Sequence, residues 1–106
     1  MGRQLRVRPA ARSDLAIWSY TRATWSTGQA KTYLRELEAV LELLLEFPET
    51  SRLRSEFSPP IRIHPYRQHV VLYSADDVRL DVLRILHRRS DWSAFLWLSD
   101  AARSHA

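Results

Sequence analysis

The chain has 106 residues, of which 45% are hydrophobic and 26% charged, and its formal net charge is +4. This length fits one domain, and the composition argues against intrinsic disorder. The absence of cysteine excludes disulfides and thiolate metal sites. We therefore expect one soluble domain spanning residues 1–106. We place it in the cytoplasm, because no segment reads as a signal peptide or a membrane span.

The first half of the sequence predicts one strand and two helices. Residues 4–8 alternate between apolar and polar side chains, as in a half-buried strand. Pro9 then opens a helix that is expected to run to about Thr24, since proline is tolerated in a first turn. A break at 26–29 leads into a second helix, which ends at Pro48 and forms an antiparallel hairpin with the first. Its apolar stripe consists of Ala30, Tyr33, Leu34, Leu37, Val40, Leu41 and Leu44.

The second half predicts a small sheet. Residues 48–60 are typical of a loop, and strands are expected at 61–64, 69–73 and 78–87, with turns at 65–67 and 74–77. The last strand has apolar residues at both parities, which indicates a central strand or one with a β-bulge. Residues 91–98 predict a short amphipathic helical tail.

These elements together predict an α+β fold of order β-α-α-β-β-β. The helical hairpin should pack on one face of a small, mostly antiparallel sheet, since each helix buries one apolar stripe. We expect the opposite sheet face to be the more polar one, with Arg62 and His64 on it and Arg84 as a further candidate.

Charge is distributed unevenly along the chain. Residues 30–47 contain two basic and four acidic side chains, a net of −2, whereas residues 52–89 contain eight arginines and four acidic side chains, a net of +4. This distribution indicates an acidic partner, either a protein or a nucleic acid.

Several short motifs follow one another in an order and spacing shared with a known family. In chain order they are Pro9-Ala10-Ala11, Asp14-Leu15, Ile17-Trp18-Ser19-Tyr20, Trp25, Gln29-Ala30 with Tyr33 and Leu37, residues 47–49 (FPE), residues 66–73 (YRQHVVLY) and residues 84–91 (RILHRRSD). The last of these is the most specific. With these motifs the chain resembles the ParE toxins of bacterial toxin–antitoxin modules, within the RelE/ParE superfamily.

The resemblance implies the toxin component of a type II module. Such a toxin would inhibit DNA gyrase, block replication and growth, and be neutralised by a ParD-like antitoxin in a hetero-oligomer. Operator DNA would be bound only through the antitoxin. No catalytic residue, cofactor, metal ion or membrane contact is expected.

The candidate site residues are mostly basic. Those proposed to contact the target or the antitoxin are Arg62, Arg67, Arg84, His87, Arg88 and Arg89. A structural alternative pairs Arg84 with Asp91. Trp18, Trp25 and Trp92 are candidates for a groove that receives an antitoxin helix, although aromatic residues at helical spacing are also typical of a core.

The alternative function is a ribosome-dependent mRNA endoribonuclease of the RelE type. Arg62, Arg67 and Arg84 would then stabilise the charged transition state, and His64 or His87 would transfer protons. However, the segment after the last strand lacks the tyrosine that such sites often carry, and the predicted sheet contains no lysine. These departures favour the gyrase-directed function.

Overall fold

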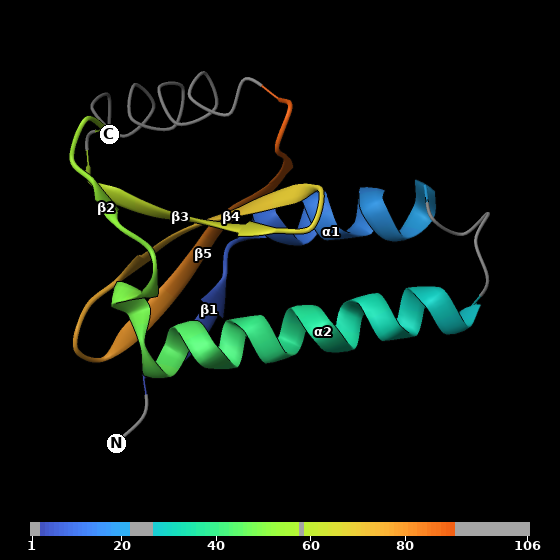
Figure 1. The fold of residues 1–106 in the computed structure, drawn as a ribbon, viewed down its shortest axis with the longest axis horizontal. Helices are drawn as coiled ribbons and strands as arrows, with labels where there is room; N and C mark the ends of the chain where they lie inside the picture. The colour runs from blue at the N-terminus through green and yellow to red at the C-terminus, as the bar shows by residue number, and fades with distance from the viewer. Residues whose placement is uncertain (1–2, 22–26, 58, 91–106) are drawn as a thin grey trace.

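The computed structural model describes residues 3–21, 27–57 and 59–90, which form two helices and a five-stranded sheet (Figure 1). In chain order the elements are β1 (Gln4–Val7), α1 (Pro9–Thr21), α2 (Thr27–Glu46), the 3-10 helix η2 (Pro48–Thr50), β2 (Leu53–Arg54), β3 (Ile61–Tyr66), β4 (His69–Ala75) and β5 (Arg79–His87). The predicted α+β class and the order of the main elements are confirmed. The predicted helical tail lies outside the described residues.

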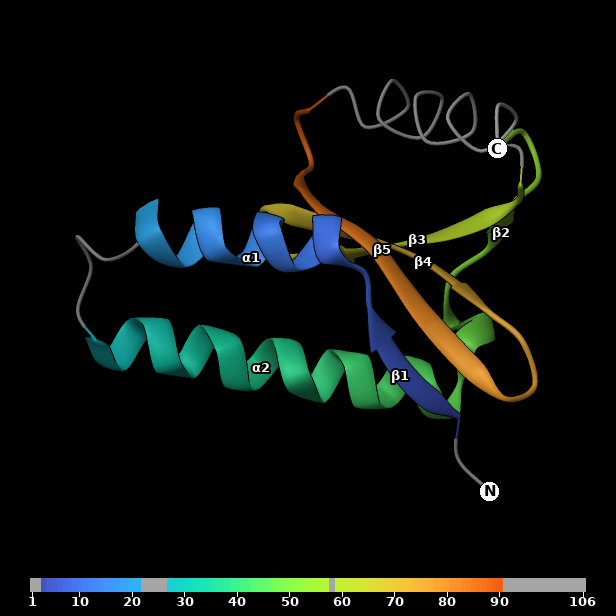
Figure 2. The same cartoon turned by 180° about the vertical axis from the view of Figure 1, so that it is seen from behind.

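The sheet has the strand order β1-β5-β4-β3-β2. β1 runs parallel to β5, whereas the other three pairs are antiparallel. Figure 2 shows β1 beside the first part of β5 and α1 beside its later part. β2 was not predicted, because two residues within a loop-like segment give no periodic signal; Leu53 pairs with Arg62 of β3.

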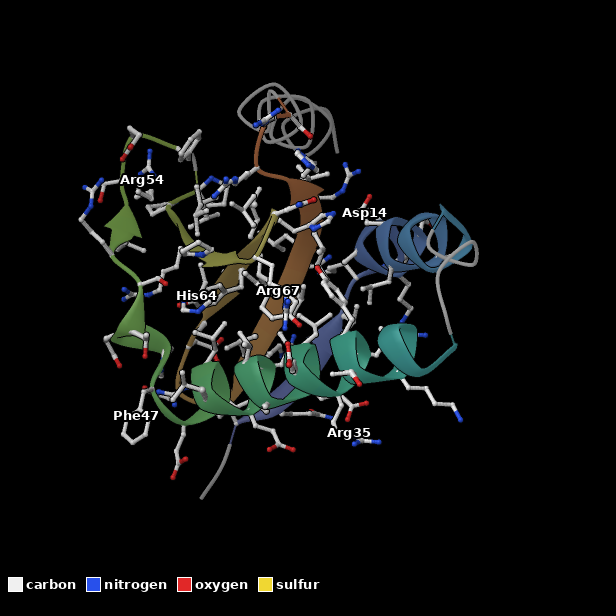
Figure 3. All side chains as sticks on the ribbon, turned by 45° about the vertical axis from the view of Figure 1, so that its right-hand side comes forward. Asp14, Arg35, Phe47, Arg54, His64 and Arg67 are labelled. Atoms are coloured by element: carbon white, nitrogen blue, oxygen red, sulfur yellow. The ribbon has the colours of Figure 1, made fainter. Side chains whose placement is uncertain are left out.

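The helical hairpin covers one face of the sheet, as predicted. The core on this side combines Ala11 of α1 and four residues of α2 with side chains from three strands: Tyr33, Leu37, Leu41, Leu44, Tyr66, Val71, Tyr73, Leu80, Val82 and Ile85. Leu34 was expected in the apolar stripe of α2, but it is 41% exposed because it lies beside the core-facing side of the helix. Phe47, which follows α2, is also exposed and points away from the sheet (Figure 3).

The opposite face of the sheet is apolar, which corrects the prediction made for Arg62 and His64. This face carries a second buried cluster of Ile61, Val70, Leu72 and Leu86, with Phe57, Ile63 and Leu83 packed against it. Arg62 pairs with Tyr73 and His64 with Val71, so both basic residues share the helix-covered face. Alternation correctly separated them from Ile61 and Ile63, but it does not say which face the helices cover.

Two hairpin turns differ in position from the prediction. Pro65 and Tyr66 belong to β3, and the turn to β4 is formed by Arg67 and Gln68. The turn between β4 and β5 is organised by Asp76, whose Oδ1 accepts the amide N–H groups of Val78 and Arg79 at 2.9 and 2.8 Å. These two amides lower the pKa of the Asp76 carboxyl.

The last strand is internal and bulged, as its apolar pattern indicated. Leu72 pairs with Arg84 and Tyr73 with Val82, so Leu83 has no counterpart on β4. The extra residue is a β-bulge, which lets Val82 and Ile85 both face the helices although they are three positions apart.

No helix in the described part of the chain combines the length and the apolar character needed to cross a bilayer.

Candidate partner-binding site

Three arginines come together at one end of the sheet, where two turns meet. Arg67 lies in the turn between β3 and β4, and Arg88 and Arg89 follow directly after β5. The two turns are joined because the Arg88 amide donates a hydrogen bond to the carbonyl oxygen of Gln68 at 2.9 Å. All three side chains are exposed. We call Arg67, Arg88 and Arg89 the basic end.

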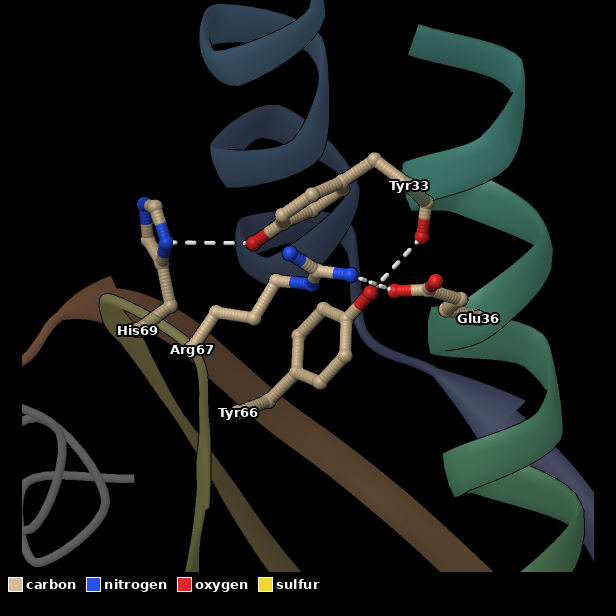
Figure 4. Close-up of polar contacts among 5 residues, drawn as sticks. All are labelled: Tyr33, Glu36, Tyr66, Arg67 and His69. Atoms are coloured by element: carbon tan, nitrogen blue, oxygen red, sulfur yellow. Dashed lines mark hydrogen bonds and ion pairs between the residues drawn. The ribbon is translucent and has the colours of Figure 1, made fainter. Parts of the chain in front are cut away.

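Arg67 is held against α2 by charge and by aromatic rings. Its guanidinium forms an ion pair with Glu36 (Figure 4). The guanidinium carbon also lies 5.7 Å from the ring centroid of Tyr33 and 6.0 Å from that of Tyr66. The pKa of Arg67 is raised, chiefly by its hydrogen bond to Glu36. Arg67 therefore stays charged and has a defined position.

The backbone of Arg67 is strained. Its φ is +56°, and it is the one non-glycine residue with a positive φ among the described parts of the chain. A side chain with a Cβ is disfavoured there, and two-residue hairpin turns usually place glycine or asparagine at such positions. The ion pair with Glu36 is exposed on both sides, and pairs of that kind contribute little stability.

A chain of polar aromatic contacts runs beneath the basic end. The hydroxyl of Tyr66 donates to the carbonyl oxygen of Tyr33 at 2.8 Å, and the hydroxyl of Tyr33 bonds to Nδ1 of His69 at 3.2 Å (Figure 4). The rings of His69 and His87 meet edge to face with centroids 5.3 Å apart. His69 is only 4% exposed and its ring is hydrogen-bonded to Tyr33, so its role is structural.

His87 supports the turn that carries the two terminal arginines. Its Nδ1 accepts the amide N–H of Arg89 at 3.1 Å, and its carbonyl oxygen accepts the amide of Ser90 at 2.9 Å. His87 thereby positions the backbone of the basic end.

Arg84 is turned toward α1. Its Nε and one Nη donate to the two carboxylate oxygens of Asp14 at 2.8 and 2.9 Å, and the Asp14 hydrogen bond raises the pKa of Arg84. Asp14 Oδ2 also accepts the amide of Ile85 at 3.0 Å. Two of the guanidinium nitrogens of Arg84 thus bind a carboxylate of the chain's own first helix.

Arg62 and His64 meet at Ser51, away from the basic end. Arg62 donates to the carbonyl oxygen of Ser51 at 2.7 Å, and Nδ1 of His64 lies 2.8 Å from the Ser51 hydroxyl. Burial lowers the pKa of His64. The structure therefore separates the six predicted contact residues. Arg62 lies at Ser51 and Arg84 at Asp14, whereas His87 lies beside the three arginines of the basic end.

The remaining predicted site residues are three tryptophans and Asp91. Trp18 belongs to α1, whereas Trp25, Trp92 and Asp91 lie outside the described residues. The predicted tryptophan groove and the Arg84–Asp91 ion pair remain predictions.

Sequence reasoning missed Asp14, Glu36 and Ser51, which hold the basic residues in place. Asp14 carried a weak signal, because an acidic residue lies within the apolar stripe between Ala11 and Leu15. Glu36 and Ser51 gave none, since their partners are distant in sequence. Among the described residues, no group of three histidine or carboxylate side chains is arranged to hold a metal ion.

Comparison with known proteins places the chain in a family. Residues 5–92, which include the basic end and Arg84, match the family described as the ParE toxin of the type II toxin–antitoxin system parDE. The chain belongs to the ParE toxin family. It is 33% identical over 92 residues to Toxin ParE1 of Caulobacter vibrioides, an alignment that covers 86% of this chain and 95% of that toxin. It is 34% identical over 85 residues to Toxin ParE1 of Mycobacterium tuberculosis, covering 78% of this chain and 87% of that toxin.

Proposed function

We propose that this ParE toxin inhibits DNA gyrase and so blocks replication, that it does so by binding rather than by catalysis, and that a ParD-like antitoxin neutralises it in the cytoplasm. The observation that carries this proposal is the family match across residues 5–92. It is supported by the motif at residues 84–91, the most specific part of the resemblance, which begins in β5 and includes Arg88 and Arg89.

The basic end is suited to contact an acidic protein surface. Arginine forks bind carboxylates through paired hydrogen bonds, and they bind more specifically when their position is fixed. Arg88 and Arg89 are exposed, and their backbone is fixed by Gln68 and His87. Arg84 has a mainly structural part in this proposal, because it is bonded to Asp14.

The proposal is tested by gyrase supercoiling in the presence of purified toxin. Wild-type toxin should inhibit supercoiling or trap cleaved DNA, and the Arg88→Ala/Arg89→Ala variant should inhibit at least about tenfold less, as expected when two contact arginines are lost. The matched control is Arg35→Ala/Arg52→Ala, which removes two exposed arginines elsewhere and should inhibit like wild type. Folded wild-type toxin that leaves gyrase unaffected at micromolar concentration would overturn the proposal.

The antitoxin part is tested separately from the target. A reading frame beside the toxin gene should encode a ribbon-helix-helix protein that binds the toxin with an affinity that falls as salt rises. The toxin alone should not shift operator DNA in a gel, whereas the complex should. Operator binding by the free toxin would contradict the assignment of DNA binding to the antitoxin.

One observation favours the endoribonuclease as a second candidate. His87 is partly exposed and directly precedes Arg88 and Arg89, and an imidazole beside arginines can transfer protons during phosphodiester cleavage. In that case the toxin would cut ribosome-bound mRNA, and His87→Ala would abolish the cutting. Intact mRNA after toxin induction would eliminate this candidate.

A further inference from the structure

Arg67 combines a strained backbone with an exposed ion pair. Its positive φ disfavours any side chain with a Cβ, and glycine would relieve that strain. The pair with Glu36 is open to solvent, since the two side chains are 53% and 43% exposed. An exposed pair offsets little of the strain, so the stability of the free toxin gives no strong reason for an arginine in this turn. Strain of this kind often marks a functional position.

The residues around Arg67 fix the position of its guanidinium, which favours binding of a carboxylate. The rings of Tyr33 and Tyr66 lie within cation–π distance of it, and Tyr66 is itself bonded to the backbone of Tyr33. Arg88 stands on the adjoining turn, which is tied to Gln68. At the Arg67 guanidinium, an approaching acidic segment meets one competing carboxylate, that of Glu36 (Figure 4).

We propose that Glu36 is an internal stand-in for a partner's carboxylate, and that an aspartate or glutamate of an acidic protein segment displaces it from Arg67 when the partner binds. This inference rests on the proposed function in taking that segment from the antitoxin. It adds a specific exchange: one ion pair within the toxin is replaced by one across the interface, while the rings keep the guanidinium in place. Glu36 then sets how tightly the segment is held.

The exchange is tested with a defined probe, a hexaglutamate peptide titrated into labelled full-length toxin. The readouts are the binding constant and the NMR signal of the Arg67 Nε–H group. Removing the competing carboxylate with Glu36→Gln should tighten binding about two- to fivefold, which is what the loss of one exposed ion pair corresponds to. The matched control is Glu38→Gln, which makes the same charge change at an exposed position on the same helix.

Two further variants isolate Arg67. In an Arg67→Ala background, Glu36→Gln and Glu38→Gln should bind the peptide equally. Arg67→Lys keeps the charge but loses the planar fork, so it should retain only part of the Glu36 effect. The same series is then repeated with the antitoxin encoded beside the toxin gene, where the Glu36→Gln effect should recur. Melting temperatures and amide spectra identify any variant that does not fold.

The proposal is wrong if Glu36→Gln and Glu38→Gln behave alike in the wild-type background, or if the Glu36 effect persists without Arg67. It is also wrong if a single-stranded oligonucleotide of equal charge shows the Glu36 dependence and the peptide does not. These outcomes are independent of the gyrase assay. A toxin that leaves gyrase untouched but shows the exchange would refute the proposed target and not the exchange.

Discussion

Arg84 of β5 and Asp14 of α1 form a two-point ion pair, with nitrogen–oxygen distances of 2.8 and 2.9 Å. The same carboxylate accepts the Ile85 amide at 3.0 Å. β1 ends at Val7, so the later part of β5 has no strand on that side. Asp14 supplies the hydrogen-bond acceptor that a longer β1 would have supplied. One side chain therefore joins the first helix to the last strand.

Replacing Asp14 with alanine should destabilise the toxin by roughly 3 kcal/mol, because the change leaves both a partly buried guanidinium and a backbone N–H without this acceptor. Arg84→Ala should cost less, since Asp14 keeps its bond to Ile85. Urea unfolding measures both, and an unchanged m-value would confirm that only stability has changed. A double-mutant cycle isolates the coupling between the two residues. Additive effects would contradict the direct pairing.

The same two residues show what sequence reasoning could and could not supply. The motif at 84–91 drew attention to Arg84, and periodicity correctly predicted that α1 and β5 exist. Neither the motif nor the periodicity could predict the contact between Asp14 and Arg84, because it depends on how α1 packs along the edge of β5 that β1 leaves unpaired. A partner 70 positions away leaves no periodic trace. The ion pair between Glu36 and Arg67 could not be predicted for the same reason, since the two residues lie 31 positions apart.

Tyr33→Phe should destabilise the toxin by about 1 kcal/mol. The substitution removes the hydroxyl that bonds to His69, while it keeps the ring that faces Arg67 and the carbonyl that accepts from Tyr66. Thermal and chemical unfolding should agree on the loss. In a His69→Leu background the same hydroxyl deletion should cost less. An equal cost in both backgrounds would show that the hydroxyl and His69 are not coupled.

Stability should fall as the pH drops below neutrality, in part because of His64. Burial lowers the pKa of His64 in the folded toxin, whereas an unfolded histidine titrates near 6.5. The unfolded chain therefore takes up the proton first. The stabilisation is complete above the unfolded pKa and is lost as the pH falls through the lower folded pKa.

The measurement compares the free energy of unfolding at pH 7.5 and pH 5 for wild type and His64→Asn. Asparagine can still bond to Ser51 but does not titrate, so the variant should lose less stability over this interval. Because the other histidines are common to both proteins, the difference between the two slopes belongs to His64. Identical slopes would show that His64 does not contribute to the pH dependence of stability. A steeper slope in the variant would show that the pKa of His64 is raised, not lowered, by folding.

The bulge in β5 was only half predictable. Apolar residues at both parities indicated either a central strand, buried on both faces, or a strand with a bulge. Which residue is extra depends on the pairing with β4, where Leu72 faces Arg84 and Tyr73 faces Val82. In the same way, alternation placed Arg62 and His64 on one face of the sheet, but it did not show that the helices cover that face. Both questions are decided by tertiary packing.

Deleting Leu83 should therefore be tolerated, although the residue lies inside a central strand. Without it, Val82 still faces Tyr73 and Arg84 still faces Leu72, so each half of β5 keeps its register. The deletion removes one partly buried side chain and alters the approach of Arg84 to Asp14, so we expect a loss of roughly 2–3 kcal/mol with cooperative unfolding retained.

The matched control for this deletion is the removal of Leu72, a leucine on the neighbouring strand that has a partner on β5. Removing it turns Val71 and the start of β4 toward the wrong face, so the core cannot form and cooperative unfolding should disappear. Circular dichroism and urea unfolding distinguish the two proteins. If the Leu83 deletion were the unfolded one, then Leu83 would be a paired residue of the strand and not the bulge.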